Sequence, residues 1–180
     1  MDLNPARLIE RLASFPRLLE ALASGFTPDE WTRRPEGGAW APAEILGHLL
    51  REEREDFRVR VRVRVRVFSA LEDPSRGWPP IDPEGDVLRH DDLNADPASM
   101  LERFRAERSD SVDRLRSLDR PEWGRTHEHP ALGPLAAGDL LASWADHDLL
   151  HARQLIKRQH QFALADAGAF GCRYAGEWTA

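Results

Sequence analysis

Apolar residues recur every three or four positions along most of this chain, which is the spacing of one face of an α-helix. The first such stripe begins after Asn4, a capping residue, and Pro5, which suits the first turn of a helix. Gly25 ends the stripe, and Pro16 within it should kink the helix. Its apolar members are Leu8, Leu12, Phe15, Leu19 and Leu22.

Two later segments show the same pattern. Asp96 and Pro97 open a helix that closes before Pro121, with an apolar face of Leu101, Phe104, Val112, Leu115 and Leu118. Residues 138–160 have no proline and no internal glycine, and their alanine, leucine, glutamine and arginine favour a further helix. The glycine-containing tail, residues 161–180, is expected to be irregular.

The segment from 42 to 71 combines two patterns. Pro42 and Glu44 are typical of a helix start. Residues 58–67, however, alternate arginine and valine, and a period of two favours a β-strand. Because both flanks have helical spacing and no partner strand is evident, we predict one helix over residues 42–71. A basic stripe for phosphate or membrane contact is the alternative, but acidic residues directly upstream offset it: Glu52, Glu53, Glu55 and Asp56.

Four amphipathic helices without a sheet predict an all-α fold, a four-helix bundle over about residues 5–160 within a single domain of residues 1–180. A long, proline-containing loop, residues 73–95, should join the second and third helices. Residues 125–130 are expected to form another loop. The spacing of Thr27 and Glu30 is that of a capping box, which predicts a short helical turn holding Trp31.

Composition narrows the class of protein. The chain has 180 residues, 41% of them apolar, which is enough for one core. A net charge of −6 argues against a general nucleic-acid-binding protein. No apolar run reaches transmembrane length and the first residues lack the apolar region of a signal peptide, so we expect a cytoplasmic protein without a membrane partner.

The candidate chemistry lies in the last predicted helix. His147 and His151 are four residues apart, so they share one helix face and form half of a possible metal site. Two hydrogen-bonded or solvated histidines on a helix flank are the alternative. A third histidine, His48, on the second predicted helix favours the metal site, because bundles build such sites between facing helices.

Three separate stretches resemble the DinB/YfiT-like superfamily of metalloenzymes. They are the run from Trp40 to His48 (Trp-Ala-Pro-Ala-Glu-Ile-Leu-Gly-His), Gly133 before the last helix, and the run from Asp146 to Gln154 with its His-x-x-x-His motif. The resemblance covers about residues 5–160. It implies a four-helix bundle, often a homodimer, and a divalent metal held by His48, His147 and His151. Ala41 departs from the serine or threonine usual there, which should cost about 1 kcal/mol of helix-end stability.

Three imidazoles leave a metal with open positions, so we expect a chemically active site rather than a closed structural one. Zinc or nickel is the expected ion. Some members of the resembled family use a low-molecular-weight thiol cosubstrate, which implies a thiol-dependent S-transferase acting on small electrophilic substrates. The alternatives are a metal-dependent hydrolase of small amides or esters, with Glu52 as base, and a non-catalytic metal-binding stress protein.

Other residues are secondary candidates. Glu52, one turn beyond His48, is either a carboxylate that supports the site or a solvated glutamate. His127 and His129 could contact substrate at the mouth of the site or be surface histidines. Cys172 is the only cysteine, so no internal disulfide can form, and it lies far along the chain from the histidines.

Overall fold

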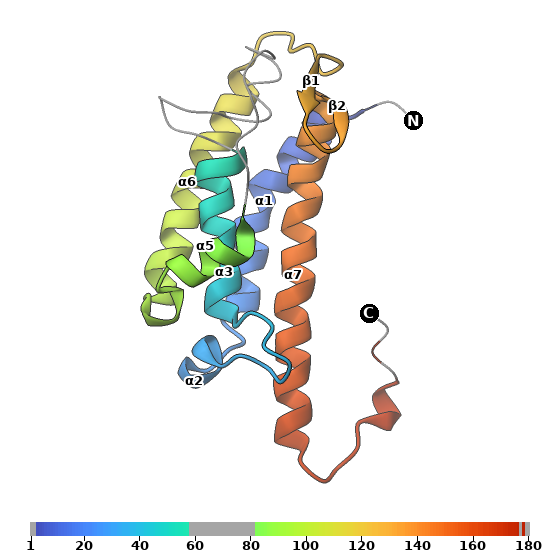
Figure 1. Ribbon diagram of the computed structural model, residues 1–180. Helices are drawn as coiled ribbons and strands as arrows, with labels where there is room; N and C mark the ends of the chain where they lie inside the picture. The colour runs from blue at the N-terminus through green and yellow to red at the C-terminus, as the bar shows by residue number, and fades with distance from the viewer. Residues whose placement is uncertain (1–2, 58–81, 177, 179–180) are drawn as a thin grey trace.

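The computed structural model describes residues 3–57, 82–176 and 178, and four of its helices pack as a bundle (Figure 1). These helices are α1 (Pro5–Ala23), α3 (Pro42–Arg51), α6 (Pro97–Ser117) and α7 (Ala137–Ala167). α3 continues directly into a π-helix, η1 (Glu52–Phe57). α1 packs against α6 and α7, and α3 packs against the same two helices. The prediction of an all-α four-helix bundle is confirmed.

The capping residues act as the sequence predicts. Asn4 accepts a hydrogen bond from the N–H of Arg7 at 3.0 Å, and Asp96 accepts one from Ser99 at 2.9 Å. The short helix α2 (Pro28–Thr32) starts with a complete capping box and buries Trp31. These caps fix where the bundle helices begin, and with them the height of each side chain along the bundle.

The start of α3 shows how the chain compensates for Ala41. The Glu44 carboxylate accepts the N–H of Ala41 at 2.8 Å, which is the half of a capping box that needs no hydroxyl at the cap. Arg34, from the preceding loop, donates to both oxygens of the same carboxylate. The helix that carries His48 is therefore anchored at its first turn although the usual hydroxyl is missing.

The connection between α3 and α6 is long, as expected. The predicted helix over residues 58–67 lies outside the described residues. The described part, from residue 82, contains α5 (Pro83–Arg89) and the 3₁₀-helix η2 (Asp92–Asn94), so it has more structure than the predicted loop. Asp82 caps α5 by accepting the N–H of Gly85 at 3.0 Å, and Val87 is buried. Both short helices pack on α3.

Residues 125–130 are not a loop. Thr126–His129 forms strand β1, paired antiparallel with β2 (Gly133–Ala136), and the hairpin lies at the start of α7 (Figure 1). Gly133, with a φ of 74°, takes the left-handed conformation that follows the turn. Four residues are too short for alternation to be a distinct signal in the sequence, which is why this hairpin was missed.

α7 extends beyond the predicted end at residue 160. Its last turns use good helix formers and bury Phe162, and Gly168, with a φ of 57°, ends it. The described part of the tail contains a 3₁₀ turn, η3 (Arg173–Ala175), and places the Trp178 ring on His160 at a centroid distance of 4.7 Å. No described helix combines the length and apolar composition needed to cross a lipid bilayer.

Gly47 provides a test of how α3 is held beside η2. A Cβ atom at Gly47 would lie 2.3 Å from the carboxylate carbon of Asp92, whose Oδ1 accepts a 2.8 Å hydrogen bond from Arg51. Gly47→Ala must therefore displace a buried ion pair, and we expect a net loss of about 1–2 kcal/mol in the free energy of unfolding, despite the better helix propensity of alanine. Urea unfolding measures this loss. Gly124→Ala, which has open space around it, is the control and should change little; equal effects of the two substitutions would contradict the prediction.

Candidate metal centre

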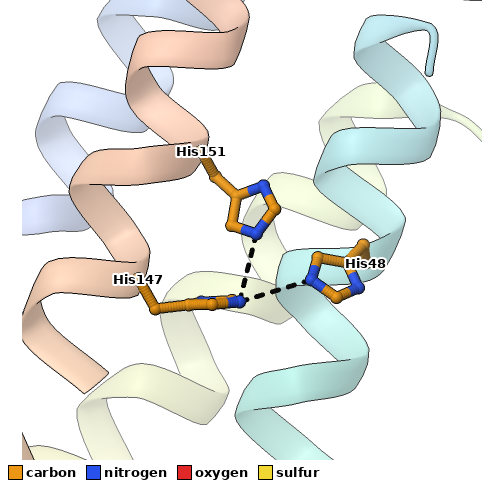
Figure 2. A group of neighbouring side chains, drawn as sticks. All are labelled: His48, His147 and His151. Atoms are coloured by element: carbon orange, nitrogen blue, oxygen red, sulfur yellow. Dashed lines mark hydrogen bonds between the residues drawn. The ribbon is translucent and has the colours of Figure 1, made fainter. Parts of the chain in front are cut away.

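Three imidazole side chains from two helices meet in the interior of the bundle (Figure 2). His48 comes from α3, and His147 and His151 come from successive turns of α7. The Nε2 atom of His147 lies 3.3 Å from Nε2 of His48 and 3.0 Å from Nε2 of His151. The structure thus brings together the three histidines that the sequence predicts as metal ligands.

The outer edge of the His151 ring indicates which of its nitrogens carries the proton. Nδ1 of His151 lies 2.9 Å from Oε1 of Gln154, an acceptor, which favours a proton on Nδ1 and a lone pair on Nε2, directed into the cluster. This is the tautomer that a metal-binding imidazole requires. Nδ1 of His48 faces Glu52, whose Oε1 is 3.9 Å away.

Burial keeps the rings uncharged. It lowers the pKa of His48 to about 3, with smaller contributions from His151 and the nearby Arg51 guanidinium. Burial, then His151, His48 and the charge of Arg108, lowers the pKa of His147 to about 2. Burial also lowers the pKa of His151, against the opposing hydrogen bond to Gln154. Neutral imidazoles with converging Nε2 atoms fit a divalent ion.

Trp40 forms a wall of the site. Its ring centroid lies 5.0 Å from that of His48, and its plane is parallel within 3° to the His151 ring at 6.4 Å. The backbone carbonyl of Trp40 accepts a 2.8 Å hydrogen bond from Nε of Arg158, which ties the loop before α3 to α7. An aromatic wall limits the access of water to this side of the cluster.

Glu52 occupies a supporting position. Glu52 lies at the Nδ1 edge of His48, whereas Nε2 of the His48 ring points toward His147. The Glu52 side chain is only 13% exposed. From there the carboxylate can orient the imidazole and increase its basicity. A general base for metal-bound water would instead have to face the Nε2 side.

The other candidate residues lie apart from the cluster. Among the described residues, the set of potential ligand side chains that converge contains only the three histidines. His127 and His129 lie on β1, where His127 is buried and Nδ1 of His129 accepts the N–H groups of Ala131 and Leu132, both at 3.1 Å. His129 therefore stabilises the hairpin turn. Cys172 is exposed in the tail.

Sequence reasoning missed a second layer of polar side chains. Arg108 of α6 is fully buried and pairs with Glu53 and Asp148, and Trp144 and Ser111 also donate to Glu53. One signal was available. Positions 104, 108, 111 and 115 share a helix face, so Arg108 and Ser111 interrupt an apolar stripe between Phe104 and Leu115.

Comparisons with known proteins agree with the fold. The family model described as the DinB superfamily matches residues 11–155 of this chain. A solved structure, YfiT from Bacillus subtilis, is similar with a TM-score of 0.74 over 88% of this chain and 87% of that one, at 17% sequence identity. It is described as a probable metal-dependent hydrolase with an unusual four-helix bundle topology. No curated protein matches the sequence.

The lowered pKa values predict how the metal-free protein responds to acid. The unfolded chain takes up protons near the ordinary histidine pKa of 6.5, whereas folded His48 resists protonation down to about pH 3. The unfolded state therefore binds more protons in this window, and stability should fall as the pH drops below 6.5. Urea midpoints between pH 7.5 and 5.5 measure the slope. His147→Asn should reduce it and the control His160→Asn should not; an unchanged slope in His147→Asn would show that the cluster does not cause it.

Proposed function

The chain belongs to the DinB superfamily, and we propose that it is a divalent-metal-dependent enzyme that joins a small thiol to an electrophilic substrate. One observation carries the proposal: the Nε2 atoms of three neutral imidazoles, two buried and one half-buried, converge from α3 and α7. A divalent ion held by them, zinc or nickel, would act as a Lewis acid that lowers the pKa of a thiol or a water molecule.

The residues of the chain have distinct tasks in this proposal. His48, His147 and His151 hold the ion through Nε2, and Gln154 and Glu52 orient two of these rings through Nδ1. The thiol loses its proton to solvent, and its sulfur forms a bond to the electrophilic carbon while the leaving group departs with its electron pair. His127 and His129, as substrate contacts, remain a prediction, and the small-molecule substrate itself is not identified by these features.

Two features favour a thiol over water as the nucleophile. A thiolate forms at neutral pH without a protein base, and Glu52 is not directed at the Nε2 side of His48. The chain also has a single cysteine, exposed in the tail, so the sulfur would come from a cosubstrate. The second candidate is hydrolysis of small amides or esters, which the fold shared with a probable metal-dependent hydrolase supports.

The deciding experiment supplies zinc-loaded protein with a chromogenic aryl halide, with and without a small thiol such as cysteine. We expect turnover only with thiol, loss of turnover on chelation, and recovery on adding metal. Cys172→Ala should keep full activity. His147→Ala should lose both the metal, measured by elemental analysis, and the activity, whereas His160→Ala on the same helix should retain both.

The alternatives give other results. A hydrolase would cleave p-nitrophenyl esters without thiol and lose most of that activity in Glu52→Gln. Metal binding that depends on the three histidines, without metal-dependent turnover of either substrate, would favour a non-catalytic role. If the His147→Ala variant retained the metal content of the wild type, the proposed metal site would be wrong.

Association into a homodimer, which the family resemblance implies, stays a prediction. Light scattering at micromolar concentration should give twice the 20.4 kDa mass of one chain. A monomer mass under these conditions would contradict it.

A further inference from the structure

Three charged side chains lie in the bundle interior, outside the set of metal ligands: Glu53, Arg108 and Asp148. The Arg108 guanidinium donates from Nη1 and Nη2 to the two oxygens of Asp148, at 2.6 and 2.9 Å. Its Nε donates to Oε2 of Glu53 at 2.9 Å, and Nη2 lies 2.9 Å from the same oxygen. At most 2% of each of these side chains is exposed. Arg108 is therefore held along two edges of its plane, a geometry that only arginine can provide.

This group connects the helices that supply the histidines. Asp148 directly follows His147 on α7, and Glu53 lies five residues after His48, at the start of the π-helix that extends α3. Arg108 belongs to α6 and also donates to the backbone carbonyl of Leu12 on α1 at 3.2 Å. One side chain thus bonds to α1, to α7 and to the π-helix that continues α3, and it fixes the two ligand-bearing helices relative to one another.

Glu53 is held by more donors than Arg108 alone. It accepts hydrogen bonds from Ser111 at 2.6 Å and from the Trp144 indole at 3.1 Å, in addition to those from Arg108. Each carboxylate of the group thus accepts more than one hydrogen bond, which fixes the plane of the Arg108 guanidinium between α7 and η1.

We propose that Glu53, Arg108 and Asp148 act as a positioning unit for the metal centre. This inference rests on the proposed function, because it requires that the three histidines bind a divalent ion. The Arg108 fork, bonded to Glu53 and Asp148, sets the separation of α3 and α7 across which the ligands must meet.

Glu53→Gln tests the hold on Arg108. It preserves the shape of the side chain but replaces one acceptor oxygen by an amide donor, which weakens the contact with the guanidinium. Titration with Co²⁺, followed by visible absorption, should show an affinity lower by about tenfold, the equivalent of about 1.4 kcal/mol. Glu102→Gln, an exposed position on the same helix as Arg108, makes the same replacement at the surface and should leave the affinity unchanged. Far-UV circular dichroism and urea midpoints establish that each metal-free variant is folded.

Arg108→Lys tests positioning. Lysine keeps the charge but cannot donate along two edges, so the spacing of the ligand helices should relax. We expect a changed Co²⁺ absorption spectrum as well as weaker binding, because the spectrum reports the arrangement of the ligands. A role in overall stability alone would lower the urea midpoint and leave the spectrum of the folded, metal-saturated protein unchanged.

Ser111→Ala provides a milder variant if the charged residues do not tolerate substitution. It removes one donor to Glu53 without changing charge, and it should weaken Co²⁺ binding a few-fold, with Ser111→Thr restoring it. If Glu53→Gln and Ser111→Ala fold and bind Co²⁺ as the wild type does, the inference is wrong while the metal site stands. If the wild type itself shows no histidine-dependent Co²⁺ spectrum, the proposed function fails, and this inference fails with it.

Discussion

The buried guanidinium of Arg108 is the constraint on which the arrangement of the four helices depends. Burying an ion pair or triad contributes little net stability, because desolvation offsets most of the Coulomb attraction, and apolar residues of similar volume often serve as well. Arg108 nevertheless lies among the rings of Phe15, Phe104 and Trp144, with acceptors on α1, η1 and α7. Its effect is therefore on specificity, since any shift of one helix leaves a buried charge without a partner.

That specificity bears directly on the metal centre. The three rings meet only while α3 and α7 keep their relative height, so helices free to slide would separate the rings. Apolar packing alone tolerates such sliding, because it has little directionality. Hydrogen bonds to the planar guanidinium are directional, so they resist it. At the other end of the site, two further sets of contacts also resist sliding of the helices. They are the Glu44 contacts at the start of α3 and the hydrogen bond from Arg158 to Trp40.

The sequence predicts those parts of the fold that depend on local spacing. The caps at Asn4, Thr27 and Asp96 are such parts, and so is the shared face of His147 and His151. His48 joined them through its place on another predicted bundle helix and through the family resemblance, because no local pattern links positions about a hundred residues apart. The features that the sequence did not predict either join residues far apart in the chain or belong to very short elements. The Glu53–Arg108–Asp148 pairing spans three helices, and β1 is too short to show a period.

The two polar groups of the interior have different tasks. Neutral imidazoles can gather in the bundle interior, because three protonated groups at this separation would repel one another strongly. The charged side chains lie apart from the imidazoles and bond to one another, to an indole and to a hydroxyl. Among the described residues, no carboxylate or thiol joins the three imidazoles as a further potential ligand. A divalent ion held there would therefore keep coordination positions open to small molecules, which a reaction at a metal requires.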